Sequence, residues 1–527
     1  MKQFIFILFI TSFWSCRNKQ IPAPEYRHEK YEMPDEKYGF LFREVMMLDQ
    51  VPPQQFNDAI PNKPVRDIIN SYRRAKNDTG FSMKKFLEEH FTLPEEYVST
   101  FIPDESRSIT EHIDALWPHL KRQADSTQPE GSPIIPLPSP YFVNEGSATQ
   151  VRYWDSYFTM LGLLESGDIQ AVTDMVDNYA FLVDEHGFVP YGNRSYLASM
   201  SNPPFFTCMV ELLIPSQGEE ILNKYASHIE KEYNYWMKMS DVVTEDNVDS
   251  LKVVKAGKYI LNRYRDENPW PRTDQYRNDI SLASNVDWRP NWQVFRDLRG
   301  GAESGWNFTS RWFHRKWRST IMTSEILPVD LNAILYHMEV TLEKIYSNMG
   351  NQEMEVMMQK AAAMRKEAIN SLFWDKGKGI YTDYEYGDST LRDRPSLAMA
   401  YPLFFGVATQ VQADSVAQYI GKEFMAQGGV VSSTHDTGQR WDYPNGWPHL
   451  QWVTVKGLDK YGHKEMAKSI ATRWVGLMER VYEDEGKFFE YYNVVELGEN
   501  DMDDDYTPDG FGPTIGVYLA LRSYLEE

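Results

Sequence analysis

The chain has 527 residues, with 54 Lys and Arg against 76 Asp and Glu, and therefore a formal net charge of −22 at pH 7. A chain this acidic repels the phosphates of nucleic acids, so we expect no nucleic-acid partner and favour a neutral ligand. A hydrophobic share of 42% is typical of a globular protein and excludes the disordered and fibrous classes.

The first residues form a predicted export signal. A short basic region precedes an apolar run from Phe4 that is too short to span a bilayer as a helix. The run ends at Cys16, in a context that resembles the processing site of bacterial lipoproteins. We predict that residues 1–16 are a signal peptide with a lipidated Cys16 and that residues 17–35 are a flexible tether. The protein would then be periplasmic or anchored in a bacterial outer membrane through its lipid alone.

Cysteine usage excludes a disulfide framework within the chain. The only cysteines are Cys16 and Cys208, and processing at the first leaves the second alone. Because Cys208 lies in the apolar run 203–210, we interpret it as a buried structural thiol rather than a nucleophile or a metal ligand. We predict no metal site.

Beyond the tether, the sequence pattern is helical to the end of the chain. Apolar residues recur at helical spacing over 331–345, with Asp330 as the expected N-cap. A stripe that includes Met354, Met357 and Met358 predicts a second helix with its methionines in the core. Further helical stripes occupy 168–183, 219–237, 397–405, 415–424 and 466–481.

The connections between these helices share a weak repeat, in which a charged, Gly-containing turn precedes an aromatic segment, at 185–188, 374–381 and 483–492. Hairpins that return such loops to one face favour a closed ring of helix pairs. Periodicity leaves a stacked bundle open as the alternative. We predict an all-α fold in which residues 36–527 form one domain.

The stretch Gly300 to Trp312, GGAESGWNFTSRW, has no helical apolar period, so we expect loop backbone. Its polar residues alternate with Trp. This combination suits a sugar, which has hydroxyls at its edges and an apolar C–H face. An ordinary Gly-rich turn with packed Trp residues is the alternative interpretation.

Two further blocks carry a resemblance to a known family. The block 153–158 (YWDSYF) resembles the end of the first trehalase signature, and 439–447 (QRWDYPNGW) resembles the second, with its Trp-Asp-x-Pro-x-Gly-Trp core intact. The likeness covers nearly the whole mature chain, from 38–42 through 192–196 to 509–512. The chain is therefore identified as a member of the trehalase family. The resemblance implies an (α/α)6 toroid that hydrolyses the disaccharide α,α-trehalose to glucose with inversion, without metal or cofactor.

An inverting glycosidase needs two carboxyl groups about 6.5–9.5 Å apart, one to protonate the leaving oxygen and one to deprotonate water. By resemblance, the base is Glu490. The acid of the family is an Asp after a Gly-Trp step, and here that position holds Asn307. An amide can hold a glycosidic oxygen but cannot protonate it, and losing a general acid costs about 10²–10⁴-fold in rate. Other candidate proton sources are Glu303, His435 and His449.

The substrate positions implied by the resemblance include several departures from the family pattern. They fall on Ser147, Trp154, Asp155, Tyr191, Met200, Ser201, Asn202, Arg272, Thr273, Asp274, Gly305, Trp441, Trp447 and Asp505. Ser147 and Met200 replace sugar-binding arginines, Tyr191 replaces an Asn, and Arg272 and Asp274 keep the charges of their triplet. Neither Ser nor Met provides the forked donor of Arg, so the site no longer favours glucose in the same way.

Several of these residues have a structural interpretation as well. Asp155 suits a helix N-cap, and the two Trp of the second signature suit a packed core. Arg194 and Arg311 either brace loops or contact the ligand. Asp442 is expected to be partly structural.

Two functions follow from the sequence. One is a trehalase-like hydrolase, impaired or altered by Asn307, that acts as a monomer on α,α-trehalose or a related α-glucoside. The other is a catalytically inactive, sugar-binding member of the family. An engineered Asp-to-Asn change is a third explanation of Asn307, but it would leave Ser147, Tyr191 and Met200 untouched.

Overall fold

The computed structural model describes residues 22–48, 50–94, 101–102, 104, 106–146, 148–498 and 510–527. Helices dominate the fold, and the strands form small sheets of two or three members, so the all-α prediction is confirmed. Within the described residues, no helix is long and apolar enough to cross a membrane. The predicted signal peptide with Cys16, together with Ser147 and Asp505, lies outside the described residues.

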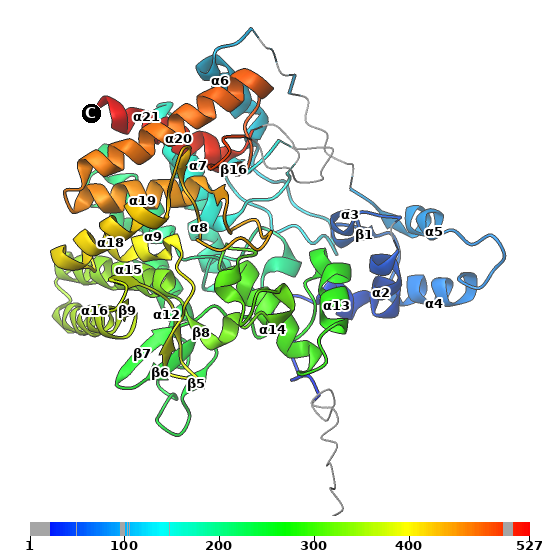
Figure 1. Ribbon diagram of the computed structural model, residues 1–527. Coiled ribbons are helices and arrows are strands. Elements are labelled where there is room, and N and C mark those ends of the chain that lie inside the picture. Colours follow the sequence, from blue (N-terminus) through cyan, green and yellow to red (C-terminus); the bar gives the residue numbers. More distant parts are fainter. Residues whose placement is uncertain are drawn as a thin grey trace, which may run out of the picture.

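The helices of the main body follow one another from α6 near the start to α21 at the end of the chain (Figure 1). They are α6 (Ile109–Leu120), α7 (Tyr153–Glu165), α8 (Ile169–His186), α9 (Phe206–Glu211), α10 (Ile214–Gln217), α11 (Ile221–Lys224), α12 (Ala226–Trp236), α13 (Tyr276–Ser284), α14 (Asn291–Glu303), α15 (Val329–Asn348), α16 (Gln352–Leu372), α17 (Tyr401–Phe404), α18 (Gln410–Glu423), α19 (Pro448–Lys460), α20 (Lys464–Glu485) and α21 (Gly512–Glu526).

The strands lie in the connections between these helices. They are β1 (Ile60–Pro61), β2 (Phe91–Thr92), β3 (Lys121–Arg122), β4 (Tyr141–Phe142), β5 (Asp249–Ser250), β6 (Val253–Ala256), β7 (Tyr259–Asn262), β8 (Ile326–Leu327), β9 (Trp374–Asp375), β10 (Ile380–Tyr381), β11 (Tyr384–Glu385), β12 (Thr390–Leu391), β13 (Met425–Ala426), β14 (Gly429–Val430), β15 (Asn445–Gly446) and β16 (Tyr492–Asn493). The antiparallel pair β15–β16 joins the predicted second signature to the segment that follows Glu490.

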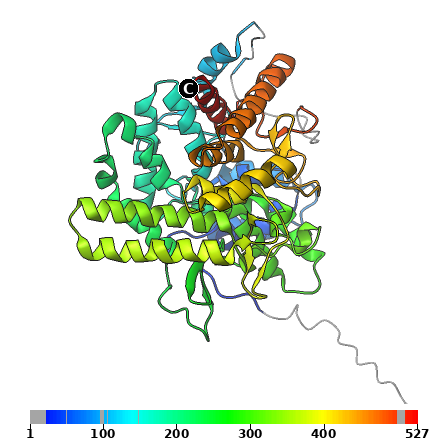
Figure 2. The ribbon, with the colours of Figure 1, turned by 60° about the vertical axis from the view of Figure 1, so that its left-hand side comes forward.

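Long helices pack as pairs. Helices α15 and α16 lie side by side over most of their length (Figure 2), and α19 packs against α20. The last helix, α21, packs on α7 near the beginning of the body, so the two ends of the helical array meet. Two glycines permit this contact, because a Cβ on Gly516 would lie 1.9 Å from the carbonyl oxygen of Phe158, and one on Gly162 would lie 2.6 Å from the Cα of Gly516.

The N-terminal helices form a smaller layer with its own apolar cluster, seen in blue in Figure 1. They are α1 (Pro34–Tyr38), α2 (Phe40–Met47), α3 (Pro53–Asn57), α4 (Val65–Ala75) and α5 (Met83–His90). Tyr276 of α13 belongs to the same cluster, which attaches the layer to the body. The preceding residues, expected to belong to a flexible tether, pack on the body from residue 22 onward: His28 bonds to the carbonyl of Ala198 (3.2 Å), and Met33 is buried.

The predicted helical stripes fall in α8, α11 with α12, α17, α18 and α20, and the helix expected over 331–345 is α15. Its predicted cap is wrong, because Pro328 is the N-cap and Asp330 lies inside the first turn, paired with a buried arginine. The methionine stripe is partly wrong as well. Met358 is buried, but Met357 is 46% exposed, since α16 is an outer helix with only one face on α15.

We expect Gly516→Ala to destabilise the protein by about 1–3 kcal/mol or more, because the added methyl group forces α21 away from α7. Urea unfolding measures the change. The matched control is Gly476→Ala in α20, where an added Cβ meets nothing within 4 Å. That change should be neutral or stabilise by up to about 1 kcal/mol, since Ala favours a helix over Gly. Equal effects of the two changes would contradict the close-packing explanation.

Candidate active site

A cavity of about 680 Å³ opens in the main body. The residues around it include Tyr191, Met200, Arg272, Asp274 and Asn307, all of which the sequence indicated. These side chains come from segments up to 116 residues apart, so the fold brings them together. The cavity is therefore our candidate active site.

Asn307 reaches the cavity from a loop whose path is fixed by Gly305. This glycine has φ +77°, and a Cβ on it would lie 2.4 Å from the ring of Trp154, so a side chain is excluded on both grounds. The loop is shorter than predicted, because α14 continues through Glu303. Gly300 and Gly301 do not break the helix; they allow close contact with the carbonyl of Tyr264 and the ring of Phe308.

Two buried polar centres hold the end of this loop. Arg311 donates two hydrogen bonds to Asp330 (2.8 and 2.7 Å) and two to Asp383 (2.6 and 2.7 Å). Its guanidinium carbon also lies 4.8 Å from the centroid of the Trp306 ring and 4.3 Å from that of the Trp312 ring. Every direction from the charged group is thus occupied by protein. Of the two interpretations of Arg311, the geometry favours the loop brace.

Asp442 is the second centre. It accepts hydrogen bonds from the Thr309 hydroxyl (2.7 Å), the Ser310 backbone N–H (2.9 Å) and the Ser433 hydroxyl (2.8 Å). The neighbouring backbone N–H of Trp441 donates to the carbonyl of Phe308 (3.2 Å). The second signature is therefore fastened directly to the loop that carries Asn307.

Arg194 and Glu303 are also braces. Arg194 pairs with Asp58 (3.1 Å) in a buried contact. Glu303 accepts from the Lys252 ammonium (2.6 and 2.7 Å) and from the backbone N–H groups of Ser201 and Arg265. With no exposed surface and both oxygens occupied, Glu303 has no path to a substrate.

Three predicted substrate residues lie behind the cavity wall. Ser201 and Asn202 are buried against Glu303, the second through its side-chain amide and the Glu303 carbonyl (3.2 Å), and Thr273 is also buried. Their observed role is to support the wall that holds Met200 and Arg272.

A stack of aromatic rings connects the segments that carry the two predicted catalytic positions. Trp306, which precedes Asn307, stacks on Trp441 (5.2 Å between ring centroids), Trp441 on Trp447 (3.8 Å), and Trp447 on Tyr491, which follows Glu490 (4.8 Å). Both faces of Trp441 and of Trp447 are therefore covered by other rings. A sugar can meet these two only at their edges.

Glu490 lies beside Arg440, with 3.5 Å between a guanidinium nitrogen and a carboxylate oxygen. Burial, together with the negative charges of Asp155 and Glu145, raises the pKa of Glu490 to about 7 against the opposing effect of Arg440 and Arg152. Since Arg152 and Arg440 both line the cavity, the carboxyl is at its edge. A carboxyl that titrates near neutral pH suits a general base.

The two histidines considered as proton sources differ in their surroundings. His449 stacks on Trp154 and bonds to Asp155 (2.9 Å). Asp155 stands in the first turn of α7 after the cap residue Arg152, so it is not an N-cap. Burial lowers the pKa of His435, which therefore carries little positive charge at neutral pH.

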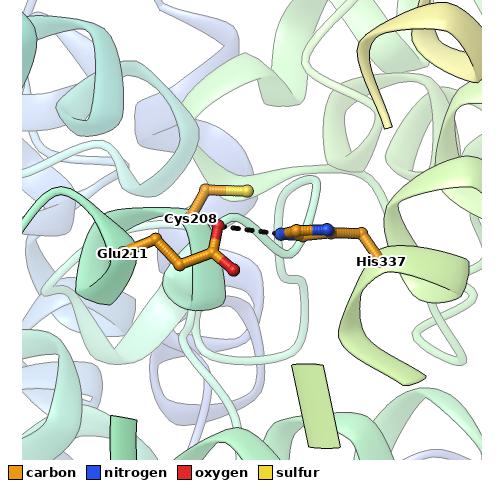
Figure 3. A group of neighbouring side chains, drawn as sticks. All are labelled: Cys208, Glu211 and His337. Atoms are coloured by element: carbon orange, nitrogen blue, oxygen red, sulfur yellow. Dashed lines mark hydrogen bonds and ion pairs between the residues drawn. The ribbon is translucent and has the colours of Figure 1, made fainter. Parts of the chain in front are cut away.

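One group among the described residues has the composition of a metal site: Cys208, Glu211 and His337, whose ligand atoms lie within 4.8 Å of one another (Figure 3). Glu211 already accepts from His337 (2.8 Å) and Thr341 (3.2 Å). Burial raises the pKa of the Cys208 thiol well above its usual value, which keeps it protonated. The contacts fit a hydrogen-bonded pair beside a structural thiol, as the sequence indicated for Cys208.

Among the cavity residues that the sequence reasoning missed are three arginines, Arg152, Arg318 and Arg440. Two of them had a signal, since Arg152 immediately precedes the first block and Arg440 lies inside the second. Arg318 had none, because it enters the cavity from a segment without a motif.

The chain matches the family model described as Trehalase over residues 41–525. It is 37% identical to a putative periplasmic trehalase of Salmonella typhi over 496 residues, which cover 94% of this chain and 87% of the relative. It is 38% identical to the periplasmic trehalase of Escherichia coli O8 (strain IAI1), over 93% of this chain and 86% of the relative.

Two solved structures resemble the fold. Neutral trehalase Nth1 from Saccharomyces cerevisiae has a TM-score of 0.60 at 23% identity, covering 73% of each chain. A GH63 mannosylglycerate hydrolase from Thermus thermophilus in complex with glucose has a TM-score of 0.50 at 17% identity, covering 73% of this chain and 95% of the other. These likenesses establish the (α/α)6 toroid.

We expect Arg311→Met to destabilise the protein by about 3–5 kcal/mol, because it leaves Asp330 and Asp383 buried without their shared cation. Chemical unfolding measures the loss. Arg315→Met, an exposed position in the same segment, removes the same charge and should change stability by less than about 0.5 kcal/mol. An equally small effect at both positions would show that Arg311 is not the brace.

Proposed function

The chain belongs to the trehalase family of glycosidases, and from this premise we propose that it acts on α,α-trehalose or a related α-glucoside with impaired or altered hydrolysis. The observation that carries the proposal is that Asn307 lines the cavity together with Arg440, whose guanidinium lies 3.5 Å from the carboxylate of Glu490. A base with a raised pKa is present at one position, and an amide stands where the family has its acid.

In the proposed reaction, ionised Glu490 removes a proton from water while the water oxygen attacks the anomeric carbon and the glycosidic bond breaks. The departing sugar oxygen leaves as an alkoxide and takes its proton from solvent water. Asn307 can donate a hydrogen bond to that oxygen, but its N–H does not transfer the proton. The slow step is therefore bond cleavage, whose rate depends on how well the leaving group carries a negative charge.

The second candidate function is a catalytically inactive sugar-binding protein. The observation that favours it is the cavity wall itself, where Met200 and Tyr191 stand at positions that the family resemblance assigns to an Arg and an Asn. Loss of those donors changes which hydroxyl groups are recognised. Ligand binding would then persist without turnover.

We further propose that the protein is exported as a monomer and held at a membrane by a lipid on Cys16. The relatives named above are periplasmic trehalases, and the sequence begins with a predicted signal peptide. Mass spectrometry of the mature N-terminus checks the lipid directly.

Asn307→Asp should raise trehalose hydrolysis by about 10²–10⁴-fold, because it restores a proton donor to the leaving oxygen. Glucose release measures it. On α-glucosyl fluoride, whose leaving group needs no proton, the unchanged chain should already be active and the variant should gain little. Glu490→Gln is the control that should abolish both activities. Absence of turnover on both substrates, with and without the substitution, would favour the inactive sugar-binding function.

The rate on α-glucosyl fluoride should fall as pH decreases through about 7, because only ionised Glu490 activates water and its pKa is raised to about 7. Above that pH the rate should be level, since the amide at the acid position does not titrate. Asn307→Asp should add a falling limb at high pH on trehalose. A midpoint near the ordinary Glu value of about 4.3 would contradict the role of burial at Glu490.

A further inference from the structure

The charge of the cavity is opposite in sign to that of the whole chain. Four arginines line it, Arg152, Arg272, Arg318 and Arg440, and the lining carboxylates are Asp274 and Asp279. Four guanidinium groups against two carboxylates leave an excess of two positive charges, in a protein whose net charge is −22. A cavity with excess positive charge in an otherwise negative protein indicates a negatively charged ligand.

One of the two carboxylates is already used. Asp279 accepts from Arg272 through both of its oxygens (3.0 and 2.6 Å), and both residues are buried. Glu490 lies 3.5 Å from Arg440 and offsets the charge of that arginine. Among the described lining residues, the remaining arginines therefore face Asp274 as the one other carboxylate.

Arg318 donates its hydrogen bonds to a neutral side chain rather than to a carboxylate. Within the described part of the chain, its Nε and Nη2 donate to the amide oxygen of Gln439 (3.0 and 2.7 Å). Its guanidinium lies 4.8 Å from the centroid of the Phe308 ring, which Arg272 also approaches, at 5.2 Å. Burial lowers the pKa of Arg318, and the positive charges of Arg272 and Arg440 lower it further against the effect of Asp279. Like charges are thus close enough to repel.

Arg152 provides a second, independent indication that the ligand carries an acceptor oxygen. Its Nη1 is buried and has no hydrogen-bond partner among the described residues, and its guanidinium lies over the ring of Tyr191 (4.7 Å). The negative charges that act on it, Asp155 and Asp274, leave this N–H without an acceptor. A buried donor without a partner is costly, so a ligand oxygen at this point is strongly favoured.

We propose that the cavity takes a saccharide carrying an anionic substituent, such as a phosphate ester, a sulfate ester or a carboxylate, with Arg318 and Arg152 as the anion-recognising residues. A neutral sugar would displace water from between the arginines and leave their repulsion uncompensated, whereas an anion removes it and forms charge-assisted hydrogen bonds. The loss of sugar-binding arginines at Ser147 and Met200 agrees with a changed ligand. This inference rests on the proposed function, since it concerns the ligand of the same site.

Calorimetry with trehalose, trehalose 6-phosphate, a sulfated trehalose and a glucuronic-acid disaccharide tests the proposal. We expect at least one anionic sugar to bind about tenfold or more tightly than trehalose, with an advantage that decreases as salt is added. Inorganic phosphate and sulfate are measured alone. Trehalose binding as tightly as every anionic sugar overturns the proposal, and so does inorganic phosphate or sulfate binding as tightly as the sugars.

Arg318→Gln should lower the ratio of the affinity for the anionic sugar to the affinity for trehalose, measured by calorimetry on the same preparation. The matched control is Arg315→Gln, which deletes the same charge from a position that is exposed like Arg318 but does not line the cavity. Arg152→Gln provides a second variant if the first fails to fold, as judged by thermal unfolding. Retention of the preference in both folded variants overturns the assignment of these residues.

Hydrolysis of α-glucosyl fluoride separates this inference from the proposed function, because the fluoride carries no anionic substituent for the arginines. Cleavage of the fluoride without any anionic preference overturns the inference alone. Anionic preference without cleavage of the fluoride supports the inference and favours the sugar-binding alternative.

Discussion

The arrangement of the site depends on one buried arginine. Arg311 shares its guanidinium between Asp330 at the start of α15 and Asp383 beyond α16, and two Trp rings cover its faces. A charge without water is tolerated only where such partners surround it, so the loop has a single position in which the group is satisfied. Because Asn307 lies four residues earlier in the same loop, the contacts of Arg311 also fix where Asn307 lies. The same ion pairs connect the loop to the helix pair α15–α16, and the toroid thereby sets the site geometry.

The two predicted catalytic residues, Glu490 and Asn307, differ in their ability to transfer a proton. Burial of the carboxyl, with the negative charges of Asp155 and Glu145, raises the pKa of Glu490 to about 7 against the effect of Arg440 and Arg152, so it can exchange a proton near neutral pH. Asn307 at the opposing position can only donate or accept hydrogen bonds. The proposed reaction therefore has a base at Glu490 and no proton donor at Asn307.

Electrostatics gives the cavity a character that motif comparison did not reveal. Positions assigned to sugar-binding arginines have changed to Met200 and to Ser147, yet the cavity has not become neutral, because Arg152 and Arg318 enter it from other positions. The cavity therefore still contains guanidinium donors, but they come from Arg152 and Arg318. The partners of these two arginines are a neutral amide for Arg318 and an aromatic face for Arg152, both of which leave room for an external acceptor.

The sequence alone predicted the family and the helical ring, because these depend on motifs and on a helical periodicity that are local along the chain, and by resemblance it proposed Glu490 and Asn307 as the catalytic positions. It also identified Tyr191, Met200, Arg272 and Asp274 as cavity residues. Only the tertiary structure decided that Arg194 and Arg311 brace loops, that Glu303 is held by Lys252, and that Ser201 and Asn202 stand behind the wall. The position of Arg318 in the cavity and the raised pKa of Glu490 were likewise decided only by the tertiary structure. Each of these results from contacts between residues far apart in the chain, and burial and charge pairing exist only once those contacts have formed.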